Sequence, residues 1–424
     1  MKLLNNEKIV VGYDLCDDFS QISYCVTGSD NVETLSSVAG AEVFNIPTVL
    51  CKREGVNQWF YGKEAIRYAD EHDGILIKNL LSLAVDGEPI QIEGNSFQPA
   101  ALLTLFMKRS LGMLAASADK IEAMMITCEK VDQDTLEVLN QVIPNLGLKT
   151  DRILFQSHTE SFYHYMIHQP EELWRFQTLL YEYRENTILV YRMECNKHTT
   201  PIVAYIDEAE YPFIFFEPMP EAEMLREEKM QRMDGEFARL AEEICQNQMI
   251  SSVFLIGERF SEEWMKESLR YLCRGRRVFQ GNNLYSKGAC YGMMERLQES
   301  DVGKNHVFLG NEKLKSNVGM KIMRRGRESY LALLDAGINW FEAEAQQEIY
   351  LSEENAIELV LTSLIGKTSR IARILLEELP AGICRIKLHL YLKDENHMIV
   401  EIEDLGFGVF REATHRVWKE EIEL

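Results

Sequence analysis

Residues 10–20, VVGYDLCDDFS, decide the fold that we expect for this chain. β-Branched residues and a glycine lead to a lone aspartate, a short polar turn follows, and the next run, QISYCV, again has the composition of a strand. We therefore predict a β-hairpin over residues 8–26. Hairpins that bind phosphate use glycine and hydroxyl side chains at the turn, whereas this turn carries Asp17 and Asp18.

Strands and helices alternate through the first part of the chain, which predicts a sheet of the α/β class. Apolar side chains recur at helical spacing, and Pro99 lies close to the start of the first such segment. We expect helices at 98–116, 133–142, 157–168 and 221–247, and a short one that ends near Leu272. We expect strands at 121–128, as a pair within 187–206, and at 251–257.

The sequence changes character near residue 301. Residues 301–317 are polar, and we expect them to form a linker. After them come short apolar runs separated by turn residues, including IELVLTSL, CRIKLHLYL and MIVEIEDL. This pattern predicts a second, all-β domain over residues 318–424.

Composition limits the partners that the chain can bind. The formal net charge of −22 disfavours nucleic acid and anionic membranes, since both attract basic side chains. No apolar run approaches the roughly 20 residues that span a bilayer, and the N-terminus has no signal-peptide pattern. The nine cysteines form no CxxC pair, which favours reduced thiols over disulfides or a zinc site. We therefore expect a cytoplasmic protein that binds neither nucleic acid nor membrane.

Several segments occur in the order that is found in a known family. After the opening hairpin come NIPTVLCKREGVNQWFYGKEA (45–65), ILIKNLLSL (75–83), MMITCEKVDQDTLEVLNQVIPNLGLKTDRILFQSHTES (124–161), SVFLIGERFSEEWMKESL (252–269), NNLYSKGACYG (282–292), FLGNEKLKSNVGMKI (308–322) and LPAGICRIKLHLYL (379–392). Together they resemble the seventy-kilodalton heat-shock chaperones and, more widely, the superfamily of actin, sugar kinases and heat-shock ATPases.

The resemblance implies an actin-like ATPase fold with two ribonuclease-H-like lobes, followed by a β-sandwich like the substrate-binding domain of the chaperones. It places a nucleotide-binding-like domain at residues 1–300, with lobe I over about 1–155 and a reduced lobe II over about 156–300. The sandwich then covers residues 318–424, with no room after it for a helical lid. An extended peptide or another protein is the partner that such a sandwich would bind.

The resemblance also implies where a nucleotide would bind. Asp14 matches the first aspartate of the family, Lys78 its catalytic lysine, and Glu160 the acid that follows its Gly-Leu turn. ATP or ADP with Mg²⁺ is the cofactor that such a site would take. The nucleotide-binding candidates are Asp14, Leu15, Cys16, Asp17, Asp18, Gly257 and Gly288.

Other positions of the family's nucleotide site are altered. Its Gly-Thr-Thr at the first hairpin is replaced by Cys16, Asp17 and Asp18, so backbone N–H groups lose their close approach to phosphate. The segment that resembles its second hairpin, RMECNKHT (192–199), has none of its glycines, and its adenosine loop keeps only Gly257. These changes predict that ATP hydrolysis has been lost.

The candidate residues also have structural interpretations. Asp14 can cap a turn, Lys78 can lie along a helix edge, and Glu160 suits the first turn of a helix. Among His158, His164 and His168, the last two share a helical face at the spacing of metal ligands. Their aromatic neighbours favour packing, so we expect no metal site.

We therefore expect a chaperone-like protein with a degenerate ATP site, which acts as a non-hydrolysing binding or scaffolding module. Two alternatives remain open. One is a weak ATPase chaperone that uses Asp14, Lys78 and Glu160. The other is an actin-like assembly protein, whose polymerisation its acidic charge would limit.

Overall fold

The computed structural model describes residues 7–38, 40–114, 118–215, 220, 222–352, 355–364 and 368–424. The chain is a mixed α/β protein with several sheets, and it divides into two compact units. The first unit comprises residues 1–195 and 206–304, and the second comprises residues 196–205 and 305–424. None of the described helices is long and apolar enough to cross a membrane.

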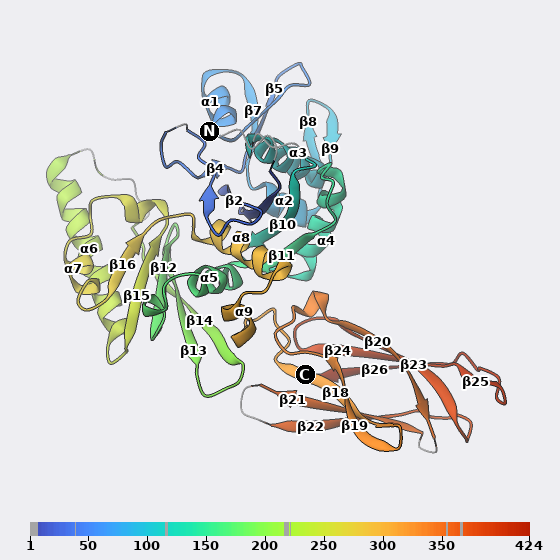
Figure 1. Cartoon of the computed structure of the whole chain (residues 1–424). Coiled ribbons are helices and arrows are strands. Elements are labelled where there is room, and N and C mark those ends of the chain that lie inside the picture. Colours follow the sequence, from blue (N-terminus) through green and yellow to red (C-terminus); the bar gives the residue numbers. More distant parts are fainter. Residues whose placement is uncertain are drawn as a thin grey trace. The chain divides into compact units, whose positions relative to one another are not determined.

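The first sheet of the first unit forms around the opening hairpin (Figure 1). Its strands are β1 (Ile9–Leu15), β2 (Phe19–Val26), β3 (Val32–Thr34), β4 (Ile46–Pro47), β10 (Ile121–Cys128) and β11 (Ile153–Ser157). Their order is β11-β10-β1-β2-β3, with β4 paired to β2. The run IVVGYDL is buried along its whole length as β1, which pairs antiparallel with β2 and parallel with β10.

A second sheet repeats this arrangement. Its strands are β12 (Gln177–Tyr183), β13 (Thr187–Asn196), β14 (Ile202–Pro212), β15 (Ile250–Ile256), β16 (Arg277–Gln280) and β17 (His306–Phe308), in the order β16-β15-β12-β13-β14-β17. β12 pairs antiparallel with β13 and parallel with β15, as β1 does with β2 and β10. Five strands of each sheet therefore follow one order, in which β1 and β12 hold equivalent places. The sixth strand differs, since β4 pairs with β2 in the first sheet and β17 pairs with β14 in the second.

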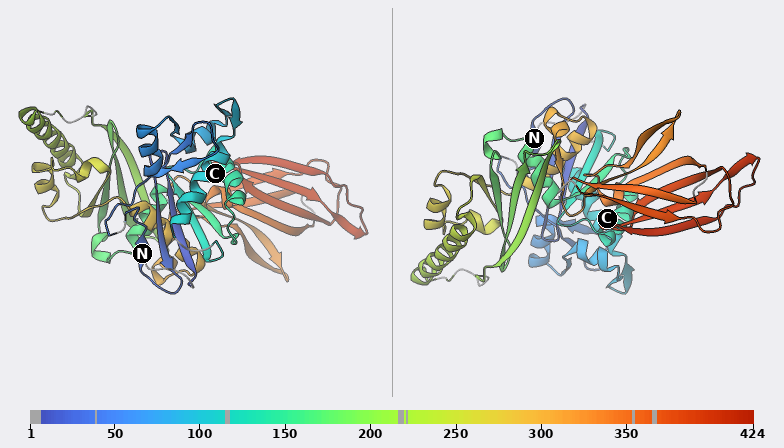
Figure 2. Two further views of the ribbon diagram at one scale, coloured as in Figure 1. Left: turned by 90° about the horizontal axis from the view of Figure 1, so that it is seen from above. Right: turned by 90° about the horizontal axis from the view of Figure 1, so that it is seen from below.

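Helices cover the outer faces of both sheets. Side chains of α3 (Pro99–Leu111) and α4 (Gln133–Val142) share a buried core with Ile9, Val11 and Tyr13 of β1. The long helix α6 (Glu223–Cys245) shares a core with β12 and β15, on the side of the second sheet away from the first (Figure 2).

Each of the two large sheets forms the core of one half of the first unit. Two helices connect these halves, because each follows a strand of one sheet and contacts the other sheet. α5 (His158–Ile167) follows β11, yet its Phe162 meets Phe254 of β15 with ring centroids 6.5 Å apart. α8 (Leu284–Leu297) follows β16, yet a Cβ at Gly12 of β1 would lie 2.2 Å from the carbonyl oxygen of Ser286. This exchange brings the first turns of α5 and α8 to the centre of the unit.

The remaining elements of the first unit are short. The helices are α1 (Gly62–Glu71), α2 (Leu80–Asp86), α7 (Glu267–Leu272) and α9 (Asp301–Asn305). The strands are β5 (Leu50–Arg53), β6 (Trp59–Tyr61), β7 (Gly74–Ile77), β8 (Ile90–Ile92) and β9 (Asn95–Phe97).

The main segment of the second unit forms two four-stranded antiparallel sheets. One has the order β19-β18-β21-β22 and the other the order β20-β23-β24-β26, and β23 alternates between buried and less buried residues as a half-covered strand should. Figure 1 shows these strands in red and orange. The bounds are β18 Ser316–Arg324, β19 Arg327–Leu334, β20 Glu344–Leu351, β21 Ala356–Ser363, β22 Ser369–Leu375, β23 Cys384–Leu392, β24 His397–Asp404, β25 Gly406–Val409 and β26 Val417–Glu423.

Two sequence expectations need correction. The segment 301–317 is not a bare linker, because it contains α9 and also β17, whose apolar residues pair with β14. The strand pair in 187–206 exists as β13 and β14, but β12 precedes it as the first strand of the second sheet. Residues 192–199 are therefore not the counterpart of the opening hairpin.

Candidate functional site

The two equivalent hairpins define the centre of the first unit. Asp14 is the last residue but one of β1, and Glu182 is the last residue but one of β12. Their turns, residues 16–18 and 184–186, hold equivalent places in the two sheets. The candidate site lies around these two strand ends.

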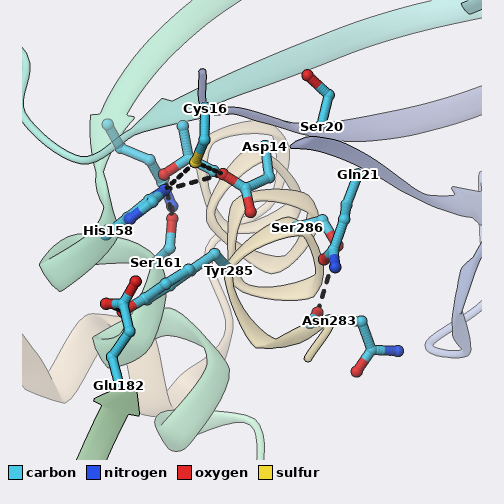
Figure 3. A network of polar contacts seen from close by, with 12 residues as sticks. Asp14, Cys16, Ser20, Gln21, His158, Ser161, Glu182, Asn283, Tyr285 and Ser286 are labelled. Carbon is cyan, nitrogen blue, oxygen red and sulfur yellow. Dashed lines mark hydrogen bonds and ion pairs between the residues drawn. The ribbon is translucent and has the colours of Figure 1, made fainter. Parts of the chain in front are cut away.

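On the side of β1, three polar side chains converge (Figure 3). His158 Nε2, on the first residue of α5, lies 2.8 Å from Asp14 Oδ1. The Cys16 thiol donates to the same carboxylate oxygen at 3.5 Å, and its Sγ lies 3.7 Å from His158 Nε2. Asp14 and His158 are both almost completely buried, and Cys16 is half-buried.

On the side of β12, an aromatic residue takes the place of the histidine. Tyr285, in the first turn of α8, donates its hydroxyl hydrogen to Glu182 Oε2 at 2.9 Å. The rings of Tyr285 and His158 stack with centroids 3.9 Å apart and an interplanar angle of 9°. A continuous chain of carboxylate, imidazole, phenol and carboxylate thus joins the ends of β1 and β12 (Figure 3).

The electrostatic environment favours the charged form of His158 and the neutral form of the Cys16 thiol. Burial opposes a charge on His158, but attraction to Asp14 and a hydrogen bond that Asp14 accepts, helped by the charges of Glu182 and Glu129, raise its pKa above the usual value. Burial, followed by the charge of Asp14, raises the pKa of the Cys16 thiol well above its usual value. Since a nucleophilic cysteine must be a thiolate, this arrangement does not suit covalent catalysis by Cys16.

Further contacts connect the two halves of the unit around this centre. Arg184, in the turn after β12, donates to Glu129 Oε1 at 2.9 Å, just after β10. Asn45 donates from Nδ2 to Glu258 Oε1 at 2.9 Å. Gln21 donates from Nε2 to the carbonyl oxygen of residue 282 at 2.6 Å. The halves are therefore joined directly by their own side chains.

The structure brings only part of the expected nucleotide site together. Asp14, Leu15 and Cys16 lie at the end of β1, where Leu15 is buried. Asp17 instead accepts from the backbone N–H groups of Leu81 (2.9 Å) and Ser82 (3.1 Å) at the start of α2. This contact explains a carboxylate in the turn, because a helix N-terminus attracts negative charge.

The other candidates do not join the cluster of Asp14, Cys16 and His158. The side chains of Asp18 and Lys78 are exposed. Glu160 lies in the first turn of α5, where its Oε1 is 3.6 Å from His164 Nε2.

The two glycines among the candidates have packing roles. Gly257 follows β15 with a φ of 110°, and a Cβ there would lie 2.6 Å from the carbonyl oxygen of Tyr183. Gly288 lies where α8 meets α5, and a Cβ there would lie 1.9 Å from the carbonyl oxygen of Ser161.

The sequence identified the histidine helix but not the role of each histidine. His164 and His168 do not form a joint metal site in the described residues, since His168 Nε2 lies 3.0 Å from Glu295 Oε1. Among the described residues, one group of three His, Cys, Asp or Glu side chains has its ligand atoms close enough together to share a metal ion. Its histidine is His158. Neither Glu182 nor Tyr285 was identified, although a strand assignment for QTLLYEY would have pointed to Glu182.

Two family models match the chain. Residues 31–311 match the model described as "Family of unknown function (DUF5716) C-terminal", and residues 313–424 match the model described as "Domain of unknown function (DUF8552)". No curated protein matches the chain. The two matches meet shortly after residue 305, where the main segment of the second unit begins, and Asp14 and Cys16 precede the first of them.

Proposed function

The chain belongs to the DUF5716 C-terminal family, whose function is unknown, and we propose that it is a binding or scaffolding protein with a closed, non-hydrolysing, actin-like first unit. Two sheets with one order of five strands and with exchanged helices support the two-lobed actin-like relationship. The second unit supplies the surface for a partner.

The stack of His158 on Tyr285 is the observation that carries this proposal. In a two-hairpin nucleotide clamp, the phosphates lie between the two turns. Here that region contains two stacked rings and the carboxylates of Asp14 and Glu182, which hold them. A phosphate brought within about 4 Å of either carboxylate would be opposed by about 1–4 kcal/mol. The nearby Arg184 is already paired with Glu129 and with Glu182 itself.

Nucleotide binding and hydrolysis test the closed first unit. We expect millimolar Mg-ATP or Mg-ADP to leave the melting temperature unchanged and phosphate release to stay at background. A site with a Kd 100-fold below the nucleotide concentration would add about 2.7 kcal/mol of stability, which a melting curve detects readily. A saturable rise in melting temperature, together with phosphate release that Asp14→Asn abolishes, would overturn the proposal and favour the weak ATPase.

The partner-binding part of the proposal rests on an edge strand of the second unit. β22 is the last strand of its sheet, and its Ile371 and Leu375 are 62% and 60% exposed. An edge strand with exposed apolar side chains can accept an extended peptide as a further strand. Peptides selected against the whole chain should bind less tightly to Ile371→Lys. Selection that yields no peptides, or peptides indifferent to this change, would count against β22 as the binding edge.

A further inference from the structure

We propose that Asp14, Cys16 and His158 form a binding site for one divalent transition metal ion that prefers mixed sulfur, nitrogen and oxygen ligands, with Zn²⁺ the best match. One ligand atom of each residue contributes, and all three lie within 4.8 Å of one another. The inference is independent of whether the first unit binds a nucleotide, because the ligands are side chains of the protein alone.

The distances between the donor atoms fit a tetrahedral ion. With Zn–N and Zn–O bonds of about 2.0 Å and Zn–S bonds of about 2.3 Å, tetrahedral angles separate N from O by about 3.3 Å and S from either by about 3.5 Å. The observed separations are 3.5 Å from Sγ to Oδ1 and 3.7 Å from Sγ to Nε2. Only the 2.8 Å between Nε2 and Oδ1 must widen, by about 0.5 Å, when the shared proton is replaced by a metal ion.

The types of donor select the class of metal. Thiolate and imidazole ligands suit zinc and its neighbours among the transition metals, whereas Mg²⁺ and Ca²⁺ require oxygen ligands. Three protein ligands leave the fourth tetrahedral position for water or another ligand, as in open zinc sites. The ion releases the thiol proton of Cys16 and the proton between His158 and Asp14, so the buried cluster stays neutral overall.

The burial and orientation of the His158 ring add to this geometry. The side chain is 2% exposed, and its Nδ1 has no hydrogen-bond partner among the described residues. The stack on Tyr285 fixes the ring so that Nε2 points at both Asp14 and Cys16 (Figure 3). Nε2, Oδ1 and Sγ thus face one another, and a cation among the three would be bound by all of them.

Metal loading of the full chain tests the proposal. Metal-free protein is titrated with Zn²⁺ and, in parallel, with Co²⁺, and bound metal is counted by mass spectrometry after desalting. We expect one equivalent of either ion, and for Co²⁺ an absorption spectrum with a thiolate-to-metal charge-transfer band. An excess of Mg²⁺ should displace neither.

Matched cysteine variants decide whether the site is the proposed one. Cys16→Ser, which is close in size, should weaken Zn²⁺ binding by at least about 100-fold and abolish the charge-transfer band. Cys273→Ser, which changes an exposed cysteine of α7's C-terminal end, should change neither. His158→Asn should behave like Cys16→Ser, and a melting curve of each variant identifies any loss of folding. Absence of bound metal in the wild-type chain, or equal binding by Cys16→Ser, would overturn the proposal.

Discussion

The imidazole of His158 and the phenol of Tyr285 stack with centroids 3.9 Å apart, although the two residues belong to helices that follow different sheets. Each ring is also hydrogen-bonded to a carboxylate. Nε2 of His158 contacts Asp14, and the hydroxyl of Tyr285 donates to Glu182. The two carboxylates occupy equivalent positions in the two sheets. These contacts fill the centre of the first unit, and the effect of losing them on stability should be measurable.

Removing the phenol ring should destabilise the first unit. Tyr285→Leu loses the stack and leaves a cavity in a buried site, which should lower the free energy of unfolding by about 2–3 kcal/mol. Tyr285→Phe keeps the stack and loses the hydroxyl with its hydrogen bond to Glu182, which should cost about 1 kcal/mol. Calorimetric unfolding of the full chain checks both, and an equal loss in the two variants would show that the stack itself contributes little.

Breaking the ion pair between Arg184 and Glu129 should loosen the contact between the halves with little loss of global stability. Their side chains are 30% and 50% exposed, so the pair contributes about 1 kcal/mol or less. Arg184→Met should speed hydrogen exchange in residues 184–190. Arg277→Met removes the exposed pair with Glu172 and is the matched control. Unchanged exchange in Arg184→Met would contradict the role of Arg184 in closure.

Asp17 should matter more to stability than its neighbour Asp18. Asp17 accepts hydrogen bonds from the start of α2, and Asp17→Ala should therefore cost about 1 kcal/mol and speed exchange in α2. Asp18 is exposed, so Asp18→Ala should stay within about 0.5 kcal/mol of wild type. Urea titrations of both variants measure the difference, and similar midpoints would refute the capping role.

A methyl group at Gly288 should disrupt the contact between α5 and α8. The added Cβ would lie 1.9 Å from the carbonyl oxygen of Ser161, so Gly288→Ala must displace backbone and should cost about 2 kcal/mol or more. Gly235→Ala in α6 meets nothing within 4 Å and should stabilise that helix by about 0.5–1 kcal/mol. The melting temperature should fall for Gly288→Ala and rise for Gly235→Ala. An unchanged melting temperature for Gly288→Ala would contradict the tight contact.

The first unit should lose stability in acid partly through Glu295. Burial opposes ionisation of this carboxyl, but hydrogen bonds from His168 and Ser300 lower its pKa to about 2, from a usual 4.5. Because the pKa is lower in the folded state, the stabilisation is complete above about pH 4.5 and is lost as the pH falls toward 2, by at most about 3 kcal/mol.

Glu295→Gln tests this pH dependence. The variant cannot gain stability from ionisation, so its unfolding free energy should fall less steeply than that of the wild type between about pH 5 and about pH 3. Urea midpoints at each pH provide the comparison. Parallel curves for the two proteins would assign the acid sensitivity to other carboxylates.

Local pattern was sufficient to predict most of the longer elements of the first unit, but few of its short strands and helices. The opening hairpin, the strand at 121–128 and the helix at 133–142 all formed within the expected ranges, because each has a clear apolar period. β12 was missed, and this one omission moved the expected second hairpin from residues 184–186 to residues 192–199. Because β12 was not expected, the second turn of the candidate site was expected at the wrong residues.

The candidate site could be predicted only where its residues are close in sequence. Asp14 and Cys16 share the opening hairpin and were identified together. Their partner His158 is 144 residues from Asp14, and Glu182 and Tyr285 are separated by 103 residues. No periodicity or spacing relates such residues, since the exchange of α5 and α8 between the sheets brings them together.

The pairing of Arg184 with Glu129 and of Asn45 with Glu258 also determines how closure responds to its surroundings. Two groups on one folded chain have an effective concentration of about millimolar or higher with respect to each other. This effective concentration does not depend on the amount of any solute. A unit closed by a diffusing ligand opens when that ligand becomes scarce. The closed unit that we propose needs no such ligand, so its opening would depend on a force or a partner that competes for those same residues.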